Sequence, residues 1–466
     1  MISIAQTLLR GVFGFRRHLF RVVLFAAFCS VSYANTVELT LLASADLHGN
    51  QNLIRNSIAP AVKKLLQESS GNLIYLDVGD CAQGSLELLL KRGSGILPEL
   101  FRSGCSIFVP GNHELEYGFE AFKKILGEFP GTILAANLHA PELEDRFTDA
   151  VIVEHDGVKT AFIGLMLKNM ENAFPVAENR FHTLPGKAVL RKTVNKVLAQ
   201  GADMIVLLRH AGKYGGGENT FDLVKDIPEI DLVIGAHTHR SDAGSMVGNA
   251  WYVQPPAHGK ALAGIKIVFD RKMRKIKQIK SSFIELGSPG ANSVAGAEKV
   301  PSWQGKTLDH PSDVIRKVYN ADLALYAVNS PAKLQGLLND PSPQLTDFYQ
   351  VFPYFDSMIT VVVTGGEFLV ILREYAKFAH KRKQYLTKSG FSADIVHGKV
   401  RHTGSIDRKR SYTLVLSAYA AAGAGGNLME TRRILKDKID YRQMADLPSL
   451  LEVLTGLQSV PQELLK

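Results

Sequence analysis

Five short apolar segments of this chain are each followed, within three residues, by aspartate, asparagine or histidine. They are Val37–Ala43, Leu73–Val78, Ile107–Val109, Met204–Leu208 and Leu232–Ile234. Each has the length and composition of a buried β-strand. Helical patterns alternate with them, at Ala61–Glu68, Phe119–Phe129 and Ala188–Gln200. This alternation predicts a layered α/β domain, in which ligands gather beyond the carboxyl ends of the strands.

The polar residues behind these segments are of the types that bind divalent cations. They are Asp46, His48, Asp80, Asn112, His210, His237 and His239. A single His-x-His pair is usually surface decoration, and a Gly-Asp at a strand end is usually a turn. Five such loops at one sheet edge would instead leave polar groups repelling one another unless cations neutralised them. Imidazole and carboxylate without thiolate suit Zn, Mn, Co, Fe or Mg.

Seven side chains are too many ligands for one cation but fit two cations that share a carboxylate. Two cations about 3.5–4 Å apart are the usual device for hydrolysing phosphate esters. They bind the ester oxygens, lower the pKa of a bridging water and stabilise the developing charge. The sequence therefore predicts a two-metal phosphoesterase with a bridging water as the nucleophile.

The loop sequences also resemble a known family. The matching segments are Asp46-Leu47-His48, Gly79-Asp80, Gly111-Asn112-His113-Glu114, His210-Ala211-Gly212 and Gly235-Ala236-His237-Thr238-His239. In this order they resemble the motifs of calcineurin-like metallophosphoesterases, and more closely those of the secreted bacterial 5′-nucleotidase and 2′,3′-cyclic phosphodiesterase group. The resemblance implies a four-layer αββα sandwich followed by a smaller α/β C-terminal domain.

The resemblance also implies roles for single residues. One ion would be held by Asp46, His48, Asp80 and His239. The other would be held by Asp80, Asn112, His210 and His237. His113 would face the ester as an acid or charge stabiliser, next to Asn112. The family has an aspartate that orients this histidine, and Glu116 stands in its place here.

The C-terminal motifs depart from the family pattern. Lys333 lies where the family carries a phosphate-binding arginine, and the segment 422–428 lacks the family's aspartate and base-stacking aromatic residue. Tyr354, Phe355 and Tyr419 could stack on a base, but we favour core aromatic residues. The basic run 380–383 could attract anions, but a solvated helix end is favoured.

The chain is expected to divide into four parts. Residues 1–34 read as a signal peptide, 35–286 as the phosphoesterase domain, 287–311 as a Gly/Ser/Pro-rich linker and 312–466 as a substrate-recognition domain. In the last part we predict helices at Val314–Tyr326 and Gly366–Phe378, and strands at Met358–Val363 and Tyr412–Leu416.

The first 34 residues predict export to the periplasm or the extracellular space. Arg16, Arg17 and Arg21 precede the apolar run Val22–Val31, and Ser32-Tyr33-Ala34 suits cleavage. An uncleaved anchor is the alternative. After cleavage we expect no membrane partner. Cys81 and Cys105 either form one disulfide or stay as buried thiols.

The formal net charge is +9, and four of the arginines lie in the leader. The remaining excess of bases is mild, so no nucleic-acid polymer is expected as a partner. The expected partner is a small phosphate ester, a nucleotide above others, and the sequence gives no evidence of an oligomeric state. The alternatives are two-metal hydrolysis of a non-nucleotide phosphate or other anionic ester, and a non-catalytic binding protein that retains the fold.

Overall fold

The computed structural model describes residues 35–69, 72–170, 180–214, 218–286, 311–340, 343–354, 356–404, 406–439 and 449–455. The predicted signal peptide, almost all of the predicted linker and Phe355 lie outside these ranges. Within them, no helix is both long enough and apolar enough to cross a membrane.

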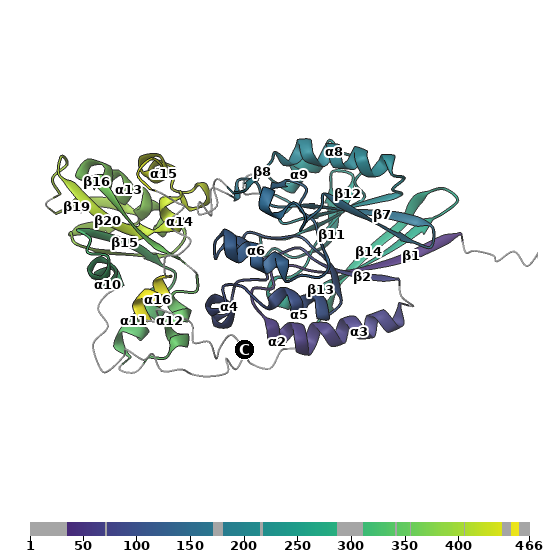
Figure 1. Ribbon diagram of the computed structural model, residues 1–466, viewed down its shortest axis with the longest axis horizontal. Coiled ribbons are helices and arrows are strands. Elements are labelled where there is room, and N and C mark those ends of the chain that lie inside the picture. The colour runs from purple at the N-terminus through teal and green to yellow at the C-terminus, as the bar shows by residue number, and fades with distance from the viewer. Residues whose placement is uncertain are drawn as a thin grey trace, which may run out of the picture.

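Two six-stranded sheets form the larger part of the molecule (Figure 1). In spatial order, the first contains β14 (Lys275–Glu285), β13 (Ala261–Asp270), β1 (Thr36–Ser44), β2 (Leu73–Asp77), β3 (Cys105–Phe108) and β4 (Thr132–Ile133). The second contains β11 (Asp242–Val247), β12 (Ala250–Gln254), β10 (Leu232–Gly235), β9 (Met204–Arg209), β7 (Val158–Leu165) and β6 (Ala150–His155). The five predicted strands before the polar loops are therefore β1, β2, β3, β9 and β10.

The two sheets pack face to face, with helices on their outer surfaces. Leu41 and Leu76 of the first sheet meet Val206 and Ile234 of the second in one buried cluster. Alternate strand residues such as Leu42 face outward instead, because successive side chains of a strand point to opposite faces. The outer helices are α3 (Ala59–Glu68), α5 (Ile96–Arg102) and α6 (Phe119–Gly127) on the first sheet, and α8 (Gly186–Ala199) and α9 (Thr220–Val224) on the second. The predicted αββα layering is confirmed.

A smaller α/β unit follows (Figure 1). Its sheet has the order β16 (Met358–Thr364), β20 (Ser411–Ser417), β15 (Leu323–Val328) and β17 (Tyr385–Ser389). One face packs against α13 (Gly365–Lys381) and α15 (Met429–Leu435). The other faces α10 (Pro311–Val318), α11 (Pro331–Asn339), α12 (Leu345–Val351) and α16 (Leu450–Thr455). Two separate clusters of apolar side chains therefore hold this sheet.

One predicted helix is wrong in this unit. The segment Val314–Tyr326 was expected to be helical throughout, but α10 ends at Val318 and β15 begins at Leu323. Asn320 takes a left-handed conformation, with φ of 46°. The Ala321 N–H then donates to the Arg316 carbonyl at 3.0 Å, which is the pattern of a helix C-terminal cap. The following buried residues pair with β20 and β17.

The short helix α4 (Leu86–Leu90) connects the two units. It follows the loop after β2, and Ser85 caps it by accepting from the Leu88 N–H. Leu86, Leu89 and Leu90 belong to the same buried cluster as Phe348 and Phe352 of the smaller unit, whereas Leu88 packs in the core beneath the first large sheet. The loop that carries Asp80 is thus joined through α4 to the apolar core of the smaller unit.

Candidate metal centre

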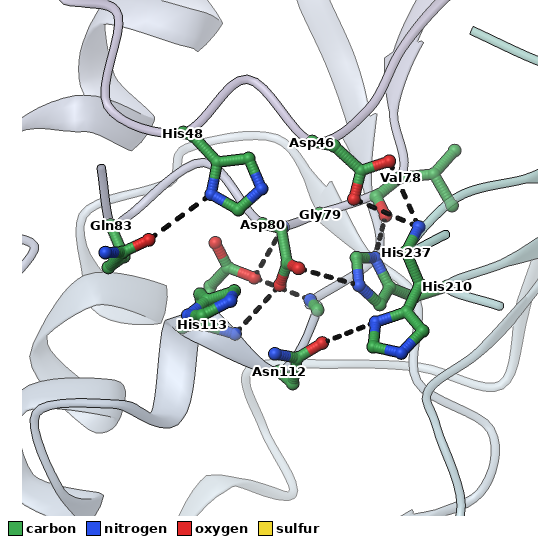
Figure 2. A network of polar contacts seen from close by, with 12 residues as sticks. Asp46, His48, Val78, Gly79, Asp80, Gln83, Asn112, His113, His210 and His237 are labelled. Carbon is green, nitrogen blue, oxygen red and sulfur yellow. Dashed lines mark hydrogen bonds and ion pairs between the residues drawn. The ribbon is translucent and has the colours of Figure 1, made fainter. Parts of the chain in front are cut away.

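The predicted ligands meet at the seam between the two large sheets (Figure 2). Asp46, His48, Asp80 and Asn112 follow β1, β2 and β3 of the first sheet, and His210, His237 and His239 follow β9 and β10 of the second. Two groups have ligand atoms within 4.8 Å of one another. They are Asp46, His48 and His239, and Asp80, His210 and His237. Each group combines residues from both sheets.

The backbone at these strand ends is bent to aim the side chains. Five of the predicted ligands have positive φ, which is uncommon outside glycine. They are Asp46 (52°), His48 (47°), Asp80 (60°), His237 (69°) and His239 (55°). Strained conformations of this kind cluster at functional sites, where the surroundings hold them in place.

Hydrogen bonds between loops hold these conformations. The Asp46 N–H donates to the Gly79 carbonyl at 2.8 Å, and the His48 N–H donates to the Asp80 carbonyl at 3.0 Å. The His237 N–H donates to the Asp46 carboxylate at 3.0 Å, which ties the second sheet to the first. A side chain at Gly111 would place its Cβ 2.3 Å from Asp80 Oδ1, so this close approach requires glycine.

Glu114 is the buried residue that organises the loop around Asp80. Its carboxylate is fully buried and accepts four backbone N–H groups. They are those of Asp80 (2.9 Å), Cys81 (2.8 Å), Ala82 (3.0 Å) and Gly111 (2.6 Å). The loop at residues 80–82 and the loop that begins at Gly111 are therefore held together by the same buried carboxylate.

Two histidines are held with one ring nitrogen turned toward the other predicted ligands. His210 Nδ1 donates to the Val78 carbonyl at 2.5 Å, and its Nε2 lies 3.1 Å from Asp80 Oδ2. Burial lowers the pKa of His210, but the charge of Asp80 outweighs it and raises the pKa to about 10, so a cation would have to displace the Nε2 proton. His237 Nδ1 lies 2.9 Å from Asn112 Oδ1.

In the group of Asp46, His48 and His239, the possible ligand atoms also lie close together. His48 Nε2 and His239 Nε2 face each other at 2.9 Å, and His239 Nε2 lies 3.8 Å from Asp46 Oδ1. Neutral imidazoles and ionised carboxylates together form a donor set that suits a divalent transition-metal cation.

The pKa values agree with this donor set in part. Burial lowers the pKa of His48 to about 3 and that of His237 to about 4, which keeps both rings neutral. Burial opposes ionisation of Asp80, but the charges of His210 and His113 outweigh it and lower the pKa of Asp80. Burial raises the pKa of Asp46 to about 7, despite the charge of His210. A cation in the seam would favour ionised Asp46.

His113 lies beside these groups with its ring fixed by Glu116. The Nδ1 atom of His113 is 2.5 Å from Glu116 Oε2, so Glu116 reaches the orienting position despite its extra methylene. The His113 N–H also donates to Asp80 Oδ1 at 2.8 Å. Burial lowers the pKa of His113, but the charges of Asp80 and Glu116 outweigh this and raise it to about 9.

Of the residues considered for substrate binding, Tyr354 lies beside the candidate metal centre, whereas Lys333 lies on the surface of α11. Tyr354 is 43% exposed, and its ring stacks against His113 with centroids 6.4 Å apart. Tyr419 is 38% exposed. The preference for core aromatic residues is therefore wrong for both tyrosines. Lys333 is exposed on α11, and its backbone N–H is capped by Ser330.

Two further residues near the site were missed as candidates, and a third was considered but set aside. His258, in the turn after β12, has its ring 5.1 Å from that of His48 and 5.2 Å from that of His239. Gln83 contacts His48. Arg382 was assigned to a solvated helix end, yet its charge acts to lower the pKa values of both Tyr354 and Tyr419, against the raising effect of burial. In the sequence, Gln83 could have been found from its place in the Gly-Asp-x-x-Gln segment, and Arg382 from the basic run 380–383.

The two cysteines of the described chain are both buried and free. Cys81 follows Asp80 directly, but its side chain lies in the core beneath the first sheet's helices. Burial raises the pKa of both thiols well above the ordinary value. The disulfide alternative is therefore not observed.

Comparison with known proteins agrees with this geometry. Residues 39–241 match the model of the calcineurin-like phosphoesterase family. These residues form a calcineurin-like phosphoesterase domain. The matched range contains the loops of all seven predicted ligands and of His113.

Relatives of the phosphoesterase domain carry nucleotidase names. A probable 5′-nucleotidase of Treponema pallidum is 29% identical over 234 residues, covering 44% of this chain and 38% of that protein. The NAD 5′-nucleotidase of Haemophilus influenzae is 27% identical over 179 residues, covering 37% of this chain and 29% of that protein. These matches span well under half of the relatives' length.

A solved structure matches almost the whole fold. A Staphylococcus aureus protein in complex with α-ketoglutarate, assigned provisionally as a 5′-nucleotidase, superposes with a TM-score of 0.69. It is 15% identical, and the match covers 90% of this chain and 96% of that protein. The arrangement of a two-sheet layered domain followed by a smaller α/β unit is therefore shared.

Proposed function

We propose that this protein is an exported two-metal hydrolase of phosphate esters, of the 5′-nucleotidase or cyclic-nucleotide phosphodiesterase type. The observation that carries the proposal is the pair of three-residue ligand groups at the seam between the sheets. One cation would be held by Asp46, His48, Asp80 and His239, and the other by Asp80, Asn112, His210 and His237. Divalent cations there would act as Lewis acids and lower the pKa of a water molecule.

His113 would provide the proton or hydrogen bond to the ester. Because Glu116 occupies Nδ1, the Nε2–H of the ring is the group left for the substrate. The carboxylate of Glu116 at Nδ1 favours the protonated ring. A protonated imidazole beside the cations would stabilise negative charge on the phosphoryl group or the leaving oxygen.

The second unit would hold the leaving group. The Tyr354 ring stacks against that of His113 with an interplanar angle of 14°, which places an aromatic face of the second unit beside the proposed reaction centre. A nucleobase would stack there, in keeping with the nucleotidase names of the relatives. Tyr419 and the cation Arg382 would line the same region.

A non-nucleotide phosphate ester is the second candidate substrate. The family's second stacking residue is absent from segment 422–428, and Leu428 at the end of this segment is fully buried in the core. A base would therefore be held on one side only. This favours a looser requirement for the leaving group than a two-sided aromatic clamp would impose.

The export proposal rests on the leader at residues 1–34, which lies outside the described residues. Its basic, apolar and small-residue parts follow the order of a cleavable signal peptide. An exported location would bring the enzyme to phosphate esters in the periplasm or outside the cell. Comparing the N-terminus of the protein secreted into the periplasm with that of the translated chain tests this point.

Turnover of the purified protein on a panel of esters tests the activity. The panel holds mononucleotides, cyclic nucleotides, dinucleotides, sugar phosphates and a chromogenic diester, each with Mn²⁺, Zn²⁺, Co²⁺, Mg²⁺ or chelator. We expect metal-dependent release of phosphate from a nucleotide. Hydrolysis of other esters alone would favour the second candidate. A folded protein that binds metal but hydrolyses nothing would be a binding protein.

A further inference from the structure

Gln83 bridges the candidate metal centre and the second α/β unit. It lies in the loop between β2 and α4 and is 5% exposed. Its Oε1 atom is 3.3 Å from His48 Nδ1, as Figure 2 shows, and its Nε2 donates to the Pro353 carbonyl at 3.0 Å. A single side-chain amide therefore contacts a predicted metal ligand of one unit and the backbone of the other.

The hydrogen-bonding capacity of each partner fixes the direction of this chain of bonds. The Pro353 carbonyl can only accept, so the Gln83 amide nitrogen must donate to it. The amide oxygen then faces His48 and can only accept from Nδ1–H. The His48 Nε2 atom is consequently left without a proton, and it is the atom that faces His239 Nε2. The second unit thus selects the His48 tautomer that binds a cation.

The Pro353 end of this bridge lies next to the proposed substrate site. Pro353 precedes Tyr354, whose ring stacks on His113. The loop around Gln83 has little freedom, because Gly84 has φ of 127° and a Cβ there would lie 2.3 Å from the His48 carbonyl oxygen. Movement of the Pro353–Tyr354 segment away from the metal centre would break the Gln83 contact.

We propose that Gln83 is a positioning residue that couples cation binding at His48 to docking of the Pro353–Tyr354 segment. The substrate-binding part of this inference rests on the proposed function. A cation bound at His48 Nε2 requires the proton on Nδ1, and this proton turns the Gln83 amide so that its nitrogen faces Pro353. By reciprocity, docking of the segment would favour the cation.

Two substitutions separate the two contacts. At pH 8, Gln83→Glu keeps an acceptor for His48 Nδ1–H but presents a carboxylate to the Pro353 carbonyl. Gln83→Met has a similar length and makes neither bond. Gln335→Glu, on the exposed side of α11, is the matched control, since it makes the same chemical change away from the site.

Calorimetric titration of the full chain with Mn²⁺ measures the first contact. For Gln83→Met we expect the affinity for one of two Mn²⁺ ions to fall by about 10-fold or more, as loss of a second-sphere partner does at metal sites. For Gln83→Glu we expect affinity no weaker than that of the unaltered protein. Unchanged affinity in folded Gln83→Met would overturn the metal part of the proposal.

Hydrogen exchange of the peptide covering residues 345–354 measures docking without any need for turnover. We expect Mn²⁺ to slow exchange in this peptide for the unaltered protein and for Gln335→Glu, and to have no such effect for Gln83→Glu. Equal protection in Gln83→Glu and in the unaltered protein would refute the coupling. Absence of ester hydrolysis by the unaltered protein would defeat the proposed function while leaving both measurements decisive for Gln83.

Discussion

The residues expected to hold cations and those expected to hold the substrate are positioned by different means. The predicted ligands follow strand ends, take left-handed backbone conformations and are locked by hydrogen bonds such as the four that Glu114 accepts. Tyr354 and Tyr419 lie outside the strands of the second unit and are 43% and 38% exposed. The first arrangement permits little movement, whereas the second leaves room for adjustment to a ligand.

The largest expected effect is that of the substitution Asp80→Asn. Asp80 is the one carboxylate that both proposed cations would share, and it also accepts the His113 N–H. Loss of a second-sphere partner alone reduces metal affinity by about 10- to 100-fold, so loss of this charge should reduce affinity by more than about 100-fold. Metal content per chain and kcat measure the effect. Lys333→Ala should change neither metal content nor kcat. A large effect of Lys333→Ala would contradict the contrast between rigidly held metal ligands and an adjustable substrate region in the second unit.

Glu116→Gln is expected to have the next largest effect. The amide cannot stabilise the imidazolium form of His113 but can still accept from its Nδ1–H, so kcat should fall by about 10- to 100-fold, less than the roughly 100- to 10,000-fold of a complete loss of acid–base catalysis. Metal content should stay unchanged. Glu116→Asp keeps the charge and should retain more activity than Glu116→Gln. Equal kcat in all three proteins would show that His113 needs no orienting carboxylate.

Tyr354→Ala tests the adjustable region. Stacking of a base on an aromatic ring contributes about 1–3 kcal/mol, so KM for a nucleotide should rise by roughly 10-fold while kcat changes little. Phe101→Ala, at an aromatic residue that is 39% exposed on the outer helix α5, serves as the control. If KM for nucleotides and for a sugar phosphate rose equally, the ring would not be reading a base.

Asp77→Asn is expected to have a smaller effect, on stability alone. Asp77 is fully buried beneath the metal loops, where it accepts from Ser44 and from the Gly79 N–H. Burial raises its pKa to about 8, above its value in the unfolded chain. Folding therefore takes up a proton between about pH 4 and pH 8, and this contribution to stability is lost as the pH rises through that range.

The asparagine can accept from the Gly79 N–H with its oxygen and donate to the Ser44 hydroxyl with its nitrogen, and it does not ionise. The difference in Tm between Asp77→Asn and the unaltered protein should therefore shift in favour of the variant from pH 5 to pH 8. Thermal unfolding in the presence of chelator at both pH values measures this shift. A difference in Tm that does not depend on pH would mean that Asp77 is already ionised in the folded protein.

The metal centre was more predictable from sequence than the substrate region, because its geometry follows from the topology of the two large sheets. Parallel strands end at the same edge of a sheet, so apolar runs followed by Asp46 or His237 imply spatial proximity without knowledge of any contact. The loop conformations are also local, since glycine at position 111 marks a close backbone approach. The αββα layers follow from the same alternation of strands and helices.

The proposed substrate region of the smaller unit was less predictable, because no periodic sequence pattern marks its residues. Tyr354 lies in a loop and Tyr419 in the one-turn helix α14 (Ala418–Ala421), and in neither place does the sequence distinguish an exposed ring from a core ring. The end of α10 depended on a left-handed Asn320, which is a conformation that asparagine tolerates but does not require. Gln83 could not be assigned a role, because its partner Pro353 is distant in the chain.

The burial of Cys81 has a consequence for the choice of metal. The chain turns after Asp80, so that the carboxylate faces the seam and the adjacent sulfur faces the apolar core. A soft thiophilic ion such as Cu(I) or Cd²⁺ therefore meets nitrogen and oxygen donors but no sulfur donor, although a cysteine is only one residue away. The direction of one turn in the backbone thus biases the centre against toxic soft metals.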